Sequence, residues 1–334
     1  MAAASSARIT NIAATTLDKM KNKLGDAIID ANPFFKFLDT KGSKVVLDGG
    51  YKYYCPVAFA QAPGGYYVPS TATSFAASGG VNEDQIQAAE YDWVFLHTYF
   101  TIHGAEKIQN MGTTQIVNLV KAKMEIAKKT LAKYLRENLF IYNANSISAT
   151  FNGLNLICTQ NGQGTLGQIE YNADEASGNW SNEYQTSHND YSELHTHMLE
   201  MWLNIVGAAG RPKVIVSHPD VYAYYEGTTG MSKMQFTDNK LLDLGFMNAT
   251  YKGCPWIVDA LCTDTAAGAG DELLYMLDTD SMGFFVHKDR NVEVEPMKRS
   301  EAMTDADFAK ILWAGNLWCN NRRHQGVIIF DQAP

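Results

Sequence analysis

Cysteine is scarce in this chain and follows no recognisable spacing. Among 334 residues there are five cysteines, an odd number, and no two of them form a Cys-x-x-Cys pair: Cys55, Cys158, Cys254, Cys262 and Cys319. This distribution argues against a disulfide framework and against a zinc knuckle. We therefore expect buried thiols in a reducing cytoplasm.

Long apolar runs and a leader sequence are also missing. No run approaches the ~18 apolar residues of a membrane span. The first residues, MAAASSARITNIAATTL, lack the basic start and apolar core of a secretory signal. The formal net charge of −9 argues against binding nucleic acid by bulk attraction. We expect a chain that is neither secreted nor inserted in a membrane, with enough apolar residues for two lobes.

The usual catalytic strings are absent, and the partial matches are weak. Residues 162–167, GQGTLG, match the dinucleotide fingerprint, but the QIEYNADEASGNW that follows is typical of turns and offers no helix N-terminus to a pyrophosphate. We predict a flexible loop there. Residues 278–281, DTDS, lack the glycine and glutamate of a calcium loop and predict a turn. Residues 322–324, RRH, could contact phosphate, although a solvated turn is favoured.

Three histidines form the best candidate for a metal site. His195 and His197 could chelate a metal with His188 as a third ligand. On a helix, however, residues two apart point about 160° away from each other, so surface histidines are the favoured interpretation. A metal-dependent enzyme using these histidines stays open as an alternative. We otherwise predict no catalytic residue, no cofactor and no metal.

The segment from Gly112 to Phe140 keeps helical spacing throughout. A helix starting at Thr113 or Thr114 would run about 26 residues and roughly 40 Å. The predicted apolar stripe comprises Ile116, Leu119, Val120, Met124, Ala127, Leu131, Tyr134 and Leu135, and Lys123 interrupts it. The opposite face comprises Lys121, Glu125, Lys128, Lys129, Lys133 and Arg136. By itself this basic face is best interpreted as a solvated surface, because Glu125 precedes Lys129 by four residues.

Residues 45–102 predict a long hairpin with a tip rich in glycine and proline. The outgoing strand would be VVLDGGYKYYCPV and the return strand AEYDWVFLHTYFTI. Apolar side chains alternate on both faces of the return strand, and an isolated two-stranded ribbon is only marginally stable. We therefore expect five aromatic residues to pack on a neighbouring chain: Tyr66, Tyr67, Phe75, Trp93 and Phe95.

The rest of the chain predicts a mixed α and β lobe. Before the hairpin, we expect residues 1–30 to form a flexible arm with a short helix that Asn32 and Pro33 end. FNGLNLIC predicts a strand, and a polar surface loop follows it to Asp190. Residues 191–206 predict a helix, KVIVS a buried strand, His218-Pro219-Asp220 a helix start, and residues 255–258 a strand. Five segments of the C-terminal third predict an antiparallel sheet: ELLYMLD, GFFVHK, NVEVEPM, residues 308–318 and GVIIF.

This order of elements resembles the major capsid proteins of tailed bacteriophages, of the Hong Kong 97 type. Local echoes are RPKVIVSHPDVYAYY, YKGCPWIVDALC and the closing FAKILWAGNLWCNNRRHQGVIIF. The resemblance implies an α+β, Hong Kong 97-like capsid fold. It divides the chain into an N-terminal arm (1–44), an extended β-hairpin loop (45–102), a spine helix with the peripheral domain (103–150), an axial domain (151–262) and a return to the peripheral β-sheet (263–334).

The same resemblance implies a structural role. Hexamers and pentamers of the chain would build an icosahedral virion shell around double-stranded DNA, assembled in a bacterial cytoplasm without a membrane, with a portal and a separate scaffolding protein. Lys128, Lys129 and Lys133 would then face the DNA inside. Lys52 is the only lysine between Val45 and Ile102 and lies on a strand, so we expect no isopeptide crosslink. An encapsulin-like compartment is the alternative within this fold.

Overall fold

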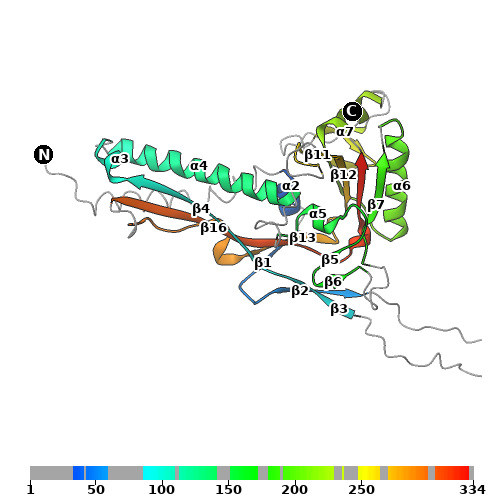
Figure 1. Ribbon diagram of the computed structural model, residues 1–334, viewed down its shortest axis with the longest axis horizontal. Coiled ribbons are helices and arrows are strands. Elements are labelled where there is room, and N and C mark those ends of the chain that lie inside the picture. Colours follow the sequence, from blue (N-terminus) through cyan, green and yellow to red (C-terminus); the bar gives the residue numbers. More distant parts are fainter. Residues whose placement is uncertain are drawn as a thin grey trace, which may run out of the picture.

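The computed structural model describes residues 33–40, 43–58, 86–109, 113–140, 151–171, 180–188, 191–228, 235–236, 247–263, 270–299 and 305–330. These residues form an elongated arm and a second lobe (Figure 1). The elongated arm consists of a six-stranded sheet and the helix that lies along it. The second lobe consists of a seven-stranded sheet and two helices.

The predicted long helix is confirmed as α4 (Thr113–Phe140), with 28 residues. Its stripe is buried at Val120, Met124, Ala127, Leu131 and Leu135. Tyr134 is an exception, because it was predicted on the stripe and is exposed. The stripe packs on β4 (Val94–His103), and Figure 1 shows α4 lying along β4 and β16.

The six-stranded sheet is built around β16 (Ala306–Cys319), a strand of 14 residues. β4 pairs antiparallel with one edge of β16. The other edge pairs in succession with β13 (Met282–His287), β14 (Glu293–Val294) and β15 (Lys298–Arg299). β1 (Lys44–Leu47) adds to β13 in parallel. The short helix α3 (Gly104–Gln109) follows β4, and η2 (Lys288–Arg290) follows β13.

The predicted hairpin is only partly right. β2 (Tyr53–Ala58) pairs antiparallel with β3 (Ile86–Tyr91), as a hairpin requires. The predicted return strand, however, divides at Asp92 and Trp93, and its second half is β4, which pairs with β16 instead of β2. The second half of the predicted return strand, β4, is therefore covered within the same chain, by α4 and by its place in the six-stranded sheet.

The seven-stranded sheet of the second lobe has the order β7-β17-β12-β8-β11-β10-β9. Its strands are β7 (Glu183–His188), β8 (Val214–Ser217), β9 (Gln235–Phe236), β10 (Met247–Tyr251), β11 (Cys254–Val258), β12 (Glu272–Leu277) and β17 (Gln325–Phe330). Helices α6 (Leu194–Gly207) and α7 (Pro219–Thr228) pack on one face through Met198, Met201, Val221 and Tyr225. The predicted helices and the strands at 213–217 and 255–258 are thus confirmed.

The C-terminal third does not form one antiparallel sheet as predicted. β13 and β16 belong to the elongated arm, whereas β12 and β17 lie in the second lobe. The chain crosses between the sheets after β12 and again after β16, where η3 (Arg322–His324) precedes β17. Each of the five predicted segments does contain a strand: β12, β13, β14, β16 and β17. Residues 263–334 contribute to both parts, and the division of the chain into five domains stays a prediction.

Two further expectations are corrected between residues 33 and 188. FNGLNLIC contains a helical turn, α5 (Leu154–Ile157), and not a strand, because Leu154 and Ile157 are three apart and both buried. The segment after it is not a simple loop, since β5 (Thr165–Leu166) pairs with β6 (Ile169–Glu170) and β7 pairs with β17. Pro33 begins α2 (Pro33–Thr40), while the helix expected before it lies outside the described residues.

One hydrophobic core runs from the elongated arm into the second lobe. It joins the buried side of α4 to the face of the seven-stranded sheet opposite α6 and α7, including Val216, Leu273 and Tyr275.

Within the described ranges, no helix combines the length and apolarity needed to cross a membrane.

Candidate functional site

The outer face of β4 exposes two aromatic residues. Along this strand Val94, Leu96 and Phe100 point into the core under α4, while the alternate residues point outward. Phe95 is 59% exposed and Tyr99 is 67% exposed. A strand with one covered face and one open aromatic face is typical of a contact surface. We call Phe95 and Tyr99 the β4 aromatic pair.

Of the other four predicted contact residues, Trp93 is used inside the subunit. Its Nε1 donates to the carbonyl oxygen of Gly50 at 3.0 Å, and its ring packs edge-on against Phe285 with centroids 4.9 Å apart. Tyr66, Tyr67 and Phe75 lie outside the described residues. The structure therefore leaves Phe95 exposed, on the same face of β4 as Tyr99.

Two further exposed apolar patches were not singled out from the sequence. Near the base of the hairpin, Tyr51 and Tyr54 are exposed, and Ile86 is exposed at the opposite end of β3, where it pairs with Ala58. On α6, Leu199, Leu203 and Val206 are exposed on the side away from the buried Met198 and Met201. The spacing of four and three residues between these side chains could have indicated an apolar face of α6 from the sequence.

The basic face of α4 is open, but its charges are not equivalent. Lys129 and Lys133 are exposed, and Lys128 is half-buried. Lys133 lies 3.5 Å from Glu137, which is the only ion pair among these three lysines in the described part of the chain. The predicted lysines therefore share one solvent-facing surface of α4 that still carries positive charge.

Arg136 has a different partner from the lysines. Its Nε and Nη2 donate to the two carboxylate oxygens of Asp259 at 2.7 and 2.8 Å. Asp259 follows β11 and its side chain is only 7% exposed. The hydrogen bonds from Arg136 to this carboxylate raise the pKa of the guanidinium. This bidentate pair links the end of α4 to the second lobe.

Lys123, which interrupts the apolar stripe of α4, reaches over the end of β4. Its Nζ donates to the carbonyl oxygen of Thr101 at 2.7 Å and forms an ion pair with Glu106 of α3 at 2.5 Å. The aliphatic part of the side chain lies on the sheet while the amine reaches polar groups. Lys123 therefore interrupts the apolar stripe but connects α4 to β4 and α3.

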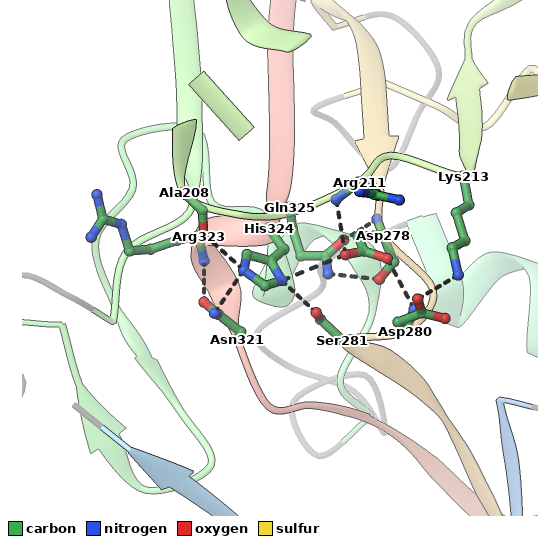
Figure 2. A network of polar contacts seen from close by, with 10 residues as sticks. All are labelled: Ala208, Arg211, Lys213, Asp278, Asp280, Ser281, Asn321, Arg323, His324 and Gln325. Atoms are coloured by element: carbon green, nitrogen blue, oxygen red, sulfur yellow. Dashed lines mark hydrogen bonds and ion pairs between the residues drawn. The ribbon is translucent and has the colours of Figure 1, made fainter. Parts of the chain in front are cut away.

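A polar network joins the two crossings between the sheets (Figure 2). Ser281 Oγ lies 2.6 Å from His324 Nδ1, and His324 Nε2 lies 3.0 Å from the carbonyl oxygen of Ala208. Asp278 accepts from the backbone amide of Arg211 at 3.1 Å, and its own amide donates to Gln325 at 3.0 Å. Asp278 also accepts from the Asp280 amide, which confirms the predicted turn.

This network contains a serine, a histidine and an aspartate but not the geometry of a catalytic triad. In a triad the serine and the aspartate contact opposite nitrogens of the imidazole. Here Asp278 Oδ2, at 3.5 Å, and Ser281 both face His324 Nδ1. The arrangement cannot pass a proton from the serine through the ring, so it holds the crossings together instead.

Arg322, expected in a solvated turn, is fully buried. Its guanidinium donates to the carbonyl oxygens of Ile157 at 3.1 Å, Gly164 at 3.2 Å and Trp180 at 3.2 Å. It also reaches the side-chain oxygens of Thr159 and Asn182. The segment 162–167, expected as a flexible loop, is therefore anchored by this side chain at Gly164. Burial lowers the pKa of Arg322.

His195 and His197 have separate surroundings and do not converge on one site. His195 Nε2 lies 3.2 Å from Thr228 Oγ1 of α7. His197 lies near Glu193 and Glu200 of its own helix, at 3.9 and 4.0 Å. The side chain of His188 lies outside the described residues. The enzyme alternative therefore has no shared metal position at His195 and His197.

Lys52 is occupied by two carboxylates. Its Nζ lies 2.8 Å from Glu90 and 3.6 Å from Asp92. The hydrogen bond that Lys52 donates to Glu90 is the main cause that raises the pKa of Lys52. A protonated, paired amine is a poor nucleophile, which is consistent with the expected absence of a crosslink.

All five cysteines are free thiols and buried, as predicted. Burial raises the pKa of Cys254 and of Cys319 to about 12 in each case. Such thiols serve as small apolar core residues.

Comparison of the sequence with protein-family models and with curated proteins finds no match. Comparison of the structure with solved structures does find matches over most of the chain. A chain of the cyanophage A-1(L) capsid asymmetric unit is 16% identical, with a TM-score of 0.64, and the match covers 88% of this chain and 92% of that one.

Two more matches have similar extent. A chain from Mycobacterium phage Bobi is 10% identical with a TM-score of 0.56, covering 87% of this chain and 89% of that chain. A chain from the capsid of an empty GTA particle is 10% identical with a TM-score of 0.55, covering 88% and 90%. The fold of this chain is therefore the Hong Kong 97-type capsid fold that the order of its elements predicted.

Proposed function

We propose that the protein is a major capsid protein, many copies of which form an icosahedral shell around double-stranded DNA. The observation that carries this proposal is the match of 88% of the chain to a cyanophage capsid chain. Nearly the whole chain is used by the match, so little remains for a separate catalytic domain. The function follows from assembly and not from a reaction.

The exposed apolar groups support assembly independently of the match. The β4 aromatic pair, the hairpin base and the α6 patch lie on different elements, and each leaves large side chains in solvent. A subunit surrounded by copies of itself needs several contact surfaces, and obligate interfaces bury about 2,000 Å² or more. We propose that hexamers and pentamers cover these patches, with the extended hairpin lying on a neighbour.

The partners follow from a closed shell that holds DNA. We propose a separate scaffolding protein, a portal, and assembly in a bacterial cytoplasm into a virion capsid. The net charge of −9 would keep packaged DNA from adhering to most of the inner surface. Lys128, Lys129 and Lys133 would be the local exception and would face the DNA.

The test is assembly of a paired variant of β4. We expect the purified wild-type protein to form closed shells or rings in negative-stain microscopy and to sediment accordingly. Phe95→Thr/Tyr99→Thr should sediment as smaller species while keeping its far-ultraviolet circular dichroism, because both side chains are exposed and threonine suits a strand.

The matched control is Tyr134→Gln, which removes an exposed aromatic residue from α4. It should assemble like the wild type, since this face is proposed to line the interior. A wild-type protein that is a stable monomer would contradict the proposal. Particles that contain a co-purified protein cargo and no nuclease-protected DNA would instead indicate an encapsulin-like compartment.

A further inference from the structure

One group of side chains in the second lobe has no part in the contacts described above. His218 follows β8, Asp220 lies in the first turn of α7, and Glu272 begins β12. β8 and β12 pair antiparallel with Ser217 opposite Leu274, which brings His218 beside Glu272 although 54 positions separate them. One potential ligand atom from each residue lies within 4.8 Å of the others.

The distances in this group match a metal site. His218 Nδ1 lies 3.4 Å from Asp220 Oδ2 and 3.4 Å from Glu272 Oε1. Ligands held at ~2.1 Å in a tetrahedron around zinc are separated by about 3.4 Å. The only other contact to this nitrogen among the described residues is a long one, from the Asp220 amide at 3.4 Å. Three acceptor atoms therefore converge where a cation would bind all of them.

The buried member of the group is held in place by its other oxygen. The Glu272 side chain is 5% exposed, and its Oε2 accepts a hydrogen bond from the hydroxyl of Tyr191. The Tyr191 ring is fixed between Tyr224 and Phe330, with centroid distances of 5.3 and 5.2 Å. This leaves Oε1 directed at His218, which is the usual arrangement of an outer-shell group around a metal ligand.

The electrostatics also favour a cation. Among the described residues, the three carboxylates of Asp220, Glu272 and the nearby Asp259 have one arginine partner, Arg136, which is bound to Asp259. In the described part of the chain, no lysine or arginine forms an ion pair with Asp220 or Glu272. Burial lowers the pKa of His218 and raises the pKa of Glu272. A neutral imidazole offers its lone pair to a metal, and a metal would offset the cost of burying the carboxylate.

We propose that His218, Asp220 and Glu272 bind a divalent transition-metal ion, and that zinc is the ion they fit. An imidazole with two carboxylates suits zinc better than magnesium or calcium, which take oxygen ligands only. Asp220 is 66% exposed, so a fourth position is open to water. The bound ion would fasten the start of α7 to the start of β12. This site lies within one subunit and does not depend on shell assembly.

Calorimetric titration of Zn²⁺ into the protein tests the site. The protein, without a histidine tag, is first treated with a chelator and dialysed. We expect one zinc ion per chain, retained in excess Mg²⁺. Asp220→Asn should weaken binding by at least the factor of about 10 that loss of an outer-shell partner costs. Glu226→Gln, which changes another exposed carboxylate of α7, should bind zinc like the wild type.

Two further variants separate a ligand role from a structural one. Glu272→Gln should abolish stoichiometric binding. Tyr191→Phe keeps the ring contacts but loses the hydrogen bond, and should weaken zinc binding by about 10-fold or more. The proposal is overturned if the wild type binds no zinc, if Mg²⁺ displaces it, or if Asp220→Asn binds zinc as tightly as Glu226→Gln does.

Discussion

Arg322 illustrates how one side chain can organise a segment that has little regular structure. A guanidinium presents five donors in a fixed plane, and here they meet backbone carbonyl oxygens from three places in residues 156–180. No carboxylate contacts it within the described ranges. The charge is therefore stabilised by peptide dipoles.

Substitution of this residue is expected to be costly. Arg322→Lys keeps the charge but loses the planar set of donors, so buried carbonyl oxygens lose their partners. We expect a loss of about 3 kcal/mol in the free energy of unfolding, measured by urea denaturation. The adjacent, exposed Arg323→Lys should change it by less than about 0.5 kcal/mol. Equal effects of the two variants would contradict the role given to Arg322.

The sequence predicted single residues well where neighbours in the chain decide their position. The alternation around Phe95 placed it on the outer face, and scattered spacing predicted the buried thiols. Arg322 and the group at His218 were missed because their partners come from distant segments. His218 and Asp220 were noted only as a helix start, since nothing local indicates that the register of β8 and β12 adds Glu272.

Among the elements, α4 contacts one part of the subunit with its middle and another part with its last turns. Its middle covers the six-stranded sheet, whereas its last turns reach the second lobe through the pair of Arg136 with Asp259. This explains a length of 28 residues, which is long for a helix in a compact core. We infer that α4 fixes the position of the second lobe relative to the six-stranded sheet.

The pair of Arg136 with Asp259 gives a stability prediction. Arg136→Met leaves the buried Asp259 carboxylate without its cation, a change that costs about 3–5 kcal/mol for a fully buried pair. Because the Arg136 side chain is 42% exposed, solvent screens part of this, and we expect a loss of about 1–2 kcal/mol in the free energy of unfolding. Urea denaturation of variants with the same sedimentation behaviour measures it.

Two controls accompany this prediction. Lys133→Met removes an exposed charge from the same helix and should cost less than about 0.5 kcal/mol. Arg136→Met/Asp259→Asn should be more stable than Arg136→Met alone, because the amide carries no charge and can still accept from the Leu261 amide. If Arg136→Met is no more harmful than Lys133→Met, the link between α4 and the second lobe does not stabilise the subunit.

The sequence predicted the elements whose apolar residues recur at regular spacing, but it did not predict which elements they pair with. The spacing in residues 112–140 and 191–206 gave α4 and α6, and apolar runs gave β8, β12 and β17. The pairing of β4 with β16 joins segments more than 200 residues apart, which local pattern cannot reveal, so β4 was assigned to the hairpin. α5 was mistaken for a strand because a short apolar run fits either structure.

For the whole molecule, the account is that one subunit is stable but incompletely covered. Its core extends through both parts, yet aromatic and aliphatic side chains remain exposed on β4, the hairpin base and α6. The exposed lysines lie on α4, which covers the opposite face of the six-stranded sheet from the β4 aromatic pair. Such a subunit would present apolar contacts and positive charge in different directions.

The central claim is that this arrangement builds a shell, and electron cryomicroscopy of purified particles tests it most directly. We expect closed icosahedral particles in which Phe95 and Tyr99 contact a neighbouring subunit and Lys128, Lys129 and Lys133 face the interior. Particles with β4 open to solvent and these lysines on the outer surface, or a purified protein that stays a monomer, would contradict the account.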